Sequence, residues 1–372
     1  RSTTTPTLLR DPPMTTSQPG RSGPQLFLVF LVMAALIAVA WGVAHPDVIA
    51  PPQPGPVENV EPRGSSAPVG TPAQAPTPTE APAEEPAEPE TSEPAEPAEP
   101  AEPAEPAPVS GATLPGGRRT VFGGNHFLVA YYGTAGTGAL GVLGETSIPE
   151  AHRRLVRAAR PYARPGAPVQ PVYELIVTIA DRTPGPDGDY SHDIDPAAVR
   201  RYVEAARRQG ALVLLDLQPG RADFLDVAKR WEWALRYPHV GLALDPEWRM
   251  ERREVPGTVI GSVGAFEVNR TSAWLSRLTV ERDLPEKLFV LHQFRTSMVE
   301  RIDKVRQRPR LALVQHVDGF GNQREKLATY GVVAFPEKFT MGFKLFYDED
   351  VNRMGPREVH RIRPRVRLIS FQ

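Results

Sequence analysis

The chain has 372 residues and no cysteine. This absence excludes disulfide bonds, metal sites built on thiolates and a lipid attached to an N-terminal cysteine. The chain also lacks the mixture of basic and aromatic residues that marks nucleic-acid-binding motifs, so we expect no nucleic-acid partner. Any folded part must depend on its apolar core, and a domain of roughly 250 residues buries enough surface to do so.

Residues 45–118 have few apolar side chains that a fold could bury. Twenty of the 42 prolines lie between Pro46 and Pro115, and Glu-Pro-Ala triplets repeat through residues 79–108. Such a segment cannot offset the entropy cost of folding, and its glutamates repel one another. We predict a disordered, extended linker, which is either a passive spacer or a ligand for a proline-binding partner.

Charged residues are absent from residues 26–44, LFLVFLVMAALIAVAWGVA. This length just suffices to span a bilayer, but the small residues near its end also suit signal-peptide cleavage. The sequence therefore leaves two alternatives, a transmembrane anchor or a signal peptide. Because arginines precede the run, we expect residues 1–25 in the cytoplasm and the rest outside. The protein is then either a membrane protein with an extracellular C-terminal domain or a secreted protein.

Charge is divided unevenly along the chain. Residues 51–110 carry a net charge of −11 and residues 1–50 carry +1, which leaves +9 on residues 111–372. A basic exported domain favours a polyanionic neighbour such as a cell-wall polymer. The alternative is that its arginine-rich helix faces only reflect coding bias.

Residues 119–372 alternate apolar, strand-like runs with amphipathic helical patterns. This order predicts right-handed βαβ units in an α/β fold. Eight strand candidates favour a (β/α)8 TIM-like barrel, with an open doubly wound sheet as the alternative. We expect distortion at the last strands, which lie too close together for a crossover helix. The strand candidates are 127–132, 172–180, 212–217, 240–244, 288–291, 311–314, 332–335 and 343–346; the helix candidates are 149–159, 196–208, 223–237, 268–282 and 322–329.

The run 239–248 contains the strongest candidate site. Its apolar part ends in Asp245 and Glu247, which point to the same side in an extended chain. Carboxylates at the carboxyl end of a barrel strand suit acid–base chemistry, and their mutual repulsion raises the pKa of a proton donor. We predict that Glu247 is a general acid assisted by Asp245. In the alternative, Asp245 caps a turn and Glu247 pairs with a nearby arginine.

Most of the other predicted strands also end in polar residues. In a barrel these ends face one cleft, so we expect the residues that follow them to line it. Glu337 or Asp216 would act with Glu247 as nucleophile or base, and aromatic rings would stack on sugar faces. The predicted substrate-binding residues are Trp248, Tyr131, Tyr132, Asp181, Gln218, His292, Gln293, His316, Asp318, Lys338 and Tyr347.

The sequence LALDPEW at 242–248 resembles the end of strand four in barrel glycoside hydrolases. Chitinase-type and lysozyme-type barrels carry Asp-x-Glu there with the Glu as acid, which matches Asp245 and Glu247. Retaining glucanase-type barrels place the acid after strand four and the nucleophile after strand seven, where Glu247 and Glu337 would lie. The chain lacks the longer Asp-Gly-x-Asp run of chitinases and the Asn-Glu pair of the glucanase clan.

Residues 126–372 as a whole also resemble exported envelope proteins of high-GC Gram-positive bacteria. Together the two resemblances imply a glycoside hydrolase that acts on a cell-wall or extracellular polysaccharide and needs no cofactor.

Two weaker patterns suggest other ligands. The run 187–195 alternates oxygen donors as calcium loops do, but it lacks the glycine and final glutamate of an EF-hand, so an ordinary polar loop is the alternative. The pattern Gly-x-Gly-x-x-Gly at 136–141 matches a dinucleotide motif, but no helix follows directly. We expect a flexible loop over the cleft instead.

Two other functions stay open. His292 and His316 could converge with Asp216 and Asp318 on zinc or manganese, as in a metal-dependent phosphodiesterase or deacetylase. Hydrogen bonding among these side chains in the barrel mouth is the alternative, and our prediction assigns no metal. A non-catalytic wall-binding module would bind polymer through Trp248 and a basic surface.

Overall fold

The computed structural model describes residues 111–372. The predicted membrane or signal segment at 26–44 and nearly all of the predicted linker lie outside the described residues. Within residues 111–372, no helix is both long enough and apolar enough to cross a membrane.

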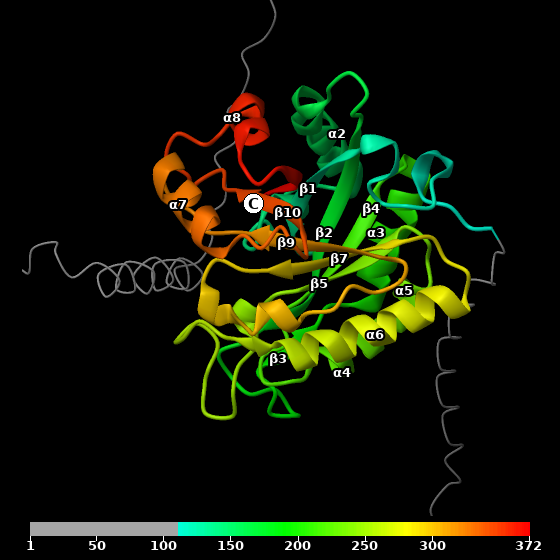
Figure 1. Ribbon diagram of the computed structural model, residues 1–372. Coiled ribbons are helices and arrows are strands. Elements are labelled where there is room, and N and C mark those ends of the chain that lie inside the picture. Colours follow the sequence, from blue (N-terminus) through cyan, green and yellow to red (C-terminus); the bar gives the residue numbers. More distant parts are fainter. Residues whose placement is uncertain (1–110) are drawn as a thin grey trace, which may run out of the picture. The chain divides into compact units, whose positions relative to one another are not determined.

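Eight parallel strands form a closed barrel, because the last strand pairs with the first as well as with its predecessor (Figure 1). This closure confirms the TIM-like barrel and rules out the open sheet. The short β3 (Ser191–Asp193) adds antiparallel to β2, and β6 (Val263–Gly264) pairs with β8 (Val299–Glu300) outside the barrel. The barrel strands are β1 (Phe127–Gly133), β2 (Val169–Ala180), β4 (Leu212–Leu217), β5 (Val240–Leu244), β7 (Lys287–His292), β9 (Leu311–Val317), β10 (Thr340–Leu345) and β11 (Val366–Phe371).

Helices surround the strands and connect most of them (Figure 1). Local sequence sets their ends: the Asp195 side chain accepts a hydrogen bond from the Ala197 N–H at 2.9 Å, and Gly210 ends the same helix with a positive φ. The α-helices are α2 (Ile148–Ala159), α3 (Pro196–Gln209), α4 (Phe224–Arg230), α5 (Glu232–Leu235), α6 (Ala265–Glu281), α7 (Gln323–Val333) and α8 (Pro356–Arg361). The 3-10 turns are η1 (Pro115–Gly117), η2 (Gly123–Asn125), η3 (Val142–Gly144), η4 (Arg160–Tyr162), η5 (Pro246–Trp248), η6 (Thr296–Met298) and η7 (Ile302–Lys304).

The predicted strand at 332–335 is wrong. The capping box of Asn322 and Glu325 starts α7, which runs on through Val333, and Val332 is 71% exposed. The true eighth strand is β11, which the sequence prediction missed. Because α8 connects β10 to β11, the last two barrel strands do have a crossover helix, and the irregularity between them is a register shift at Met341 and Gly342. The irregular connection lies between β7 and β9, where η6, β8 and η7 take the place of an α-helix.

The amino-terminal half of the barrel interior is apolar. Leu114, which precedes the expected domain start at 119, is buried with Val121 against this interior. A second and larger core fills the space between the strands and the helices, since neighbouring strand residues point to opposite faces. The inner apolar residues are Leu128, Ala130, Val172, Leu212, Leu214, Ala243, Leu288, Val290, Ala312, Val314 and Leu368.

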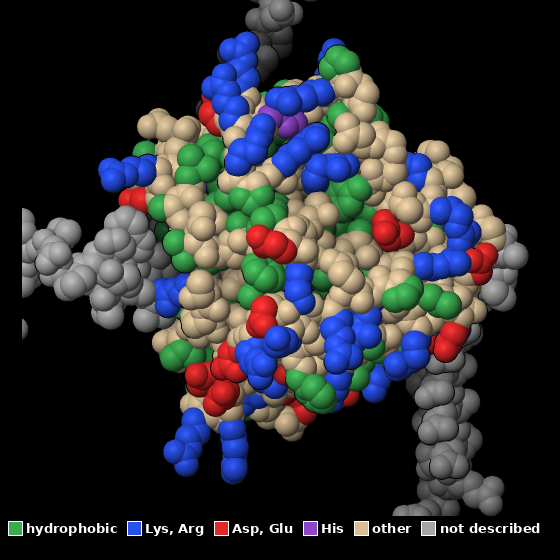
Figure 2. Space-filling view, in the orientation of Figure 1, with side chains coloured by type: hydrophobic (Ala, Val, Ile, Leu, Met, Phe, Trp, Pro, Cys, Tyr) green, Lys and Arg blue, Asp and Glu red, His purple; other side chains and the backbone are tan. Residues whose placement is uncertain are grey.

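Positive charge is spread over the face shown in Figure 2. Lys and Arg side chains gather at the top of this view, and toward the bottom they mix with Asp and Glu. This face therefore presents a mosaic rather than a single basic stripe.

Candidate active site

The barrel interior becomes polar toward the carboxyl ends of its strands. Strand register places these side chains at neighbouring heights: Tyr132 pairs with Glu174, His292 with His316, and Lys344 with Ser370. They are all buried. We call this set the polar layer; its members are Tyr132, Glu174, Asp216, His292, His316, Lys344 and Ser370.

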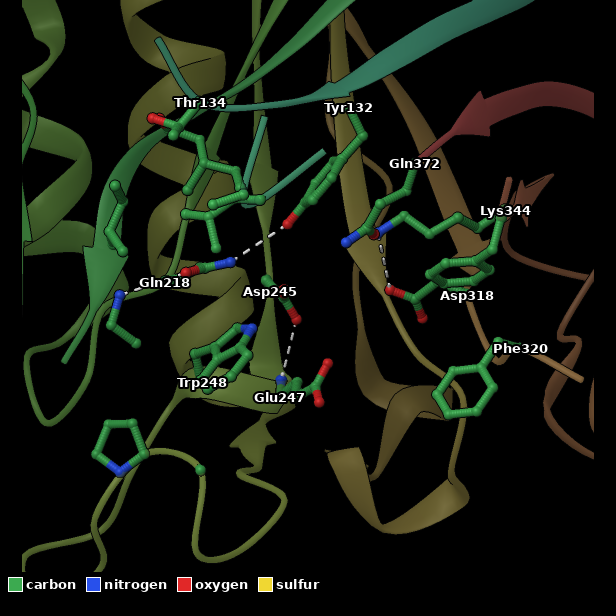
Figure 3. Close-up of a pocket in the computed structure, with 18 of the residues that line it drawn as sticks. Tyr132, Thr134, Gln218, Asp245, Glu247, Trp248, Asp318, Phe320, Lys344 and Gln372 are labelled. Carbon is green, nitrogen blue, oxygen red and sulfur yellow. Dashed lines mark hydrogen bonds and ion pairs between the residues drawn. The ribbon is translucent and has the colours of Figure 1, made fainter. Parts of the chain in front are cut away.

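A pocket of about 560 Å³ opens directly above the polar layer (Figure 3). Residues at or just beyond the carboxyl ends of the barrel strands line it, as expected for this fold. Its wall includes Thr137, Ala139 and Leu140, so the glycine-containing run 136–141 contributes to the pocket. Its polar and aromatic lining residues include Tyr132, Asp181, His192, Gln218, Asp245, Glu247, Trp248, Phe294, Asp318, Phe320, Lys344 and Phe346.

A capped turn, rather than an extended strand, places the two acids of LALDPEW in the pocket. β5 ends at Leu244, and the Asp245 Oδ1 accepts a hydrogen bond of 3.2 Å from the Glu247 N–H at the start of η5. Arg249 pairs with Glu267 at 3.0 Å. Among the described residues, Glu247 Oε1 has no hydrogen-bond partner. Asp245 thus caps a turn, and the neighbouring Arg249 pairs with Glu267 instead of Glu247.

Both carboxyl groups of this turn favour their protonated forms. Burial raises the pKa of Glu247 well above its usual value, and the nearby charges of Asp245 and Asp318 raise it further. Burial likewise raises the pKa of Asp245 to about 8, with added repulsion from Asp216 and Asp318. A carboxylic acid that keeps its proton at neutral pH can donate it to a bound molecule.

Asp318 has the opposite character. Burial alone would raise its pKa, but the hydrogen bond from His292 and the positive charges of His292 and Lys344 lower the pKa to about 2. Its Oδ2 lies 3.0 Å from His292 Nδ1 and 3.9 Å from Lys344 Nζ. Figure 3 shows Glu247 and Asp318 reaching into the pocket from different strand ends. The pocket thus contains one carboxyl group that holds its proton and one that releases it.

Three of the predicted site residues lie beneath the pocket, in the polar layer. Asp216 accepts a hydrogen bond of 2.9 Å from the Tyr132 hydroxyl, and burial raises the pKa of Asp216 to about 6. His292 and His316 are completely buried, with ring centroids 5.0 Å apart. They support the pocket from below rather than line it.

Five further predicted residues lie outside the pocket. Glu337 and Lys338 precede β10, so they lie near its amino end, away from the pocket. Glu337 is exposed, and Lys338 donates a hydrogen bond of 3.0 Å to the Val305 carbonyl. Tyr131 points to the opposite face from its neighbour Tyr132. The Tyr131 hydroxyl lies in the outer core, 3.3 Å from that of Tyr347. Gln293 accepts a hydrogen bond of 2.6 Å from Gln315.

Sequence reasoning missed two charged residues of the polar layer, Glu174 and Lys344. Each is the single charged residue of its strand and is at most 4% exposed. The available signal was a charged residue at an inward-facing position of a buried strand. Burying such a charge costs free energy unless the charge has a partner, so an isolated one indicates a function. The predicted site residues lie at or beyond the carboxyl ends of the predicted strands, whereas Glu174 and Lys344 lie nearer the strand starts.

The run 187–195 forms a polar turn that leads into the short strand β3, and Asp195 at its end caps α3. The Asp189 Oδ1 accepts from the Ser191 N–H at 3.0 Å, and the Asp193 Oδ1 accepts from the Thr178 hydroxyl at 2.6 Å. The carboxylate oxygens of Asp189 and Asp193 therefore accept hydrogen bonds from the run itself and from β2. At the pocket rim, His192 Nδ1 lies 2.5 Å from Asp181 Oδ2.

Among the described residues, Glu174, His292 and His316 form the group whose donor atoms could hold a metal ion. No protein-family model and no curated protein matches the chain. A functional assignment must therefore depend on the residues of the site.

Proposed function

We propose that this domain is a glycoside hydrolase that cleaves a cell-wall or extracellular polysaccharide, with Glu247 as its acid. The supporting observation is a buried carboxyl group that keeps its proton, Glu247, in one pocket with an ionised carboxylate, Asp318. Glycosidic hydrolysis uses two carboxyl groups in these two states on either side of the bond.

In the proposed reaction, Glu247 donates its proton to the leaving oxygen as the glycosidic carbon–oxygen bond breaks. Asp318 either attacks the anomeric carbon or removes a proton from the attacking water. In both cases the net reaction is hydrolysis, which adds a hydroxyl to the anomeric carbon and a hydrogen to the leaving sugar. Asp245 positions Glu247 through the backbone hydrogen bond at the start of η5, and Lys344 helps to hold Asp318.

The pocket lining supports a carbohydrate substrate. Trp248, Phe294, Phe320 and Phe346 supply aromatic surface on which sugar rings can stack, and Gln218 adds hydrogen-bonding groups. The volume of about 560 Å³ lies within the range of about 300–1,000 Å³ typical of ligand pockets. A pocket of this size would hold a short section of a polymer. The choice of a wall or extracellular polymer follows from the predicted export of residues 45–372.

Incubation of the full-length chain with fractionated cell-wall polymers, followed by mass spectrometry of the released fragments, tests this proposal. We expect cleavage by the wild type and a loss of about 10²–10⁴-fold in rate for Glu247→Gln, because the amide cannot supply the proton. Glu337→Gln is the matched control, since this exposed glutamate lies outside the pocket and the variant should cleave normally.

Equal rates for Glu247→Gln and the wild type would show that the assignment is wrong. Polymer binding without release of fragments from any fraction would indicate a wall-binding module instead. If cleavage occurs, the anomeric configuration of the first product, read by NMR, distinguishes the two roles of Asp318: retention indicates direct attack, and inversion indicates an activated water.

A further inference from the structure

We propose that the polar layer contains a binding site for a divalent transition metal, with Glu174, His292 and His316 as ligands and Asp216 as a fourth donor. The site lies below the pocket, inside the barrel, and the proposal does not depend on glycoside hydrolysis. It is carried by the arrangement of donor atoms on four strands, β2, β4, β7 and β9.

The spacing of the donors suits one ion. Donor atoms of Glu174, His292 and His316 all lie within 4.8 Å of one another. His292 Nε2 is 3.3 Å from Glu174 Oε1 and 3.7 Å from Asp216 Oδ1. Two ligands bound about 2.0–2.1 Å from a tetrahedral zinc ion lie about 3.4 Å apart, so small side-chain shifts would complete the site.

The same atoms are buried without hydrogen-bond partners. Within residues 111–372, this is true of both Glu174 oxygens, Asp216 Oδ1, His292 Nε2 and His316 Nδ1. Glu174, Asp216 and both histidines are completely buried. Leaving so many polar atoms unsatisfied in one place is costly. A metal ion would give all four side chains a common partner.

In each histidine, the ring nitrogen that would not bind the metal has a polar partner, as is usual in metal sites. His292 Nδ1 lies 3.0 Å from Asp318 Oδ2, and His316 Nε2 lies 3.2 Å from the Ser370 hydroxyl. Histidine ligands usually bond their second nitrogen to a carboxylate or another polar group, which fixes the ring orientation. Gly342 makes room for the His316 ring, because a Cβ at position 342 would lie 2.6 Å from His316 Cδ2.

The ligand set favours zinc. Two imidazoles and one carboxylate are a common zinc set, and Asp216 would complete a closed tetrahedral site. Cobalt(II), manganese(II) and iron(II) accept similar ligands. The competing interpretation is a metal-free ion pair between protonated His292 and Glu174, which would use the same atoms. The test must separate a metal ion from a proton.

The experiment uses the full-length chain, stripped with a chelator, passed through a desalting column and then loaded with Zn²⁺ or Co²⁺. We expect one equivalent of metal per chain by elemental mass spectrometry, visible absorption of Co²⁺ typical of nitrogen and oxygen ligands, and a higher Tm for the loaded protein. Ser370→Ala should weaken Zn²⁺ binding by about 10–100-fold through loss of an outer partner. Glu174→Gln and His316→Gln should weaken it more than Ser370→Ala does.

His152→Gln is the matched control, because His152 lies on α2 outside the barrel and should leave metal binding unchanged. Circular dichroism identifies any variant that does not fold. Ser370→Ala removes only one oxygen, so we expect this variant to fold and to report on metal binding even if a ligand variant does not fold. No retained metal and no Co²⁺ spectrum in the wild type would overturn the proposal. Equal binding by wild type, Ser370→Ala, Glu174→Gln and His316→Gln would overturn it too, because the metal would then lie elsewhere. Neither result depends on cleavage of a polysaccharide.

Discussion

At the scale of single residues, Asp245 links burial to a measurable pH dependence. The side chain is 2% exposed and its pKa is raised to about 8, whereas an unfolded Asp titrates near about 3.9. Between these two values the folded state keeps a proton that the unfolded state has lost. The free energy of unfolding therefore falls as pH rises, by up to about 1.4 kcal/mol per pH unit from this group.

We expect Asp245→Asn, which cannot titrate, to lose this part of the pH dependence. From pH 5 to pH 7, urea unfolding should show the variant gaining stability relative to the wild type, by up to about 1.4 kcal/mol per unit. Asp226→Asn is the control, because its side chain is 74% exposed. A pH-independent difference between Asp245→Asn and wild type would mean that Asp245 is already ionised in the folded protein.

Single residues were predictable where a strand visibly ends in acids. LALDPEW identified Asp245 and Glu247, which both line the pocket. The alternation of strand residues could have separated Tyr132, which faces the pocket, from Tyr131, which faces the outer core. Glu174 and Lys344 were missed because an isolated charge within a strand looks the same whether it faces the barrel interior or an exposed edge. Their burial depends on the register of neighbouring strands, which composition does not show.

At the scale of elements, two valines distinguish an observed strand from a predicted strand that the structure does not contain. Val290 lies in β7 and is completely buried in the inner core, whereas Val332 lies in α7 and is 71% exposed. We expect Val290→Ala to lower the free energy of unfolding by about 2–3 kcal/mol, from lost burial and the remaining cavity. Val332→Ala should change it by less than about 0.5 kcal/mol. Chemical denaturation measures both; a large loss for Val332→Ala would restore the predicted strand at 332–335.

Strands with uninterrupted apolar runs were found correctly, because burial on both faces leaves a clear signal in sequences such as VGLAL of β5. β11 was missed because Arg367 interrupts its run, and only its pairing with β1 and β10 identifies it as a barrel strand. The run at 332–335 is apolar, but the capping box before it starts a helix that includes its first two residues. At residues 332 and 333, the helix signal of the capping box therefore determined the secondary structure, and the apolar run did not.

At the scale of the whole molecule, closure of the barrel brings together residues that are far apart in sequence. Glu174 and His316 share the polar layer although more than a hundred residues separate them, because β2 and β9 contribute to the same interior. The number of strands predicted a barrel. It could not show which side chains meet inside, since this depends on strand register. The candidate metal site and the pairing of Glu247 with Asp318 follow only from the closed structure.

The central claim is that Glu247 is the acid of a glycoside hydrolase. The most direct test is how the loss of kcat/KM caused by Glu247→Gln depends on the leaving group of the substrate. The measurement compares kcat/KM of wild type and Glu247→Gln on a fragment of the cleaved polymer and on the matching dinitrophenyl glycoside, whose leaving group needs no proton. We predict a loss of about 10²–10⁴-fold on the fragment and less than about 10-fold on the dinitrophenyl glycoside. Equal losses on both substrates would contradict the role of Glu247 as proton donor.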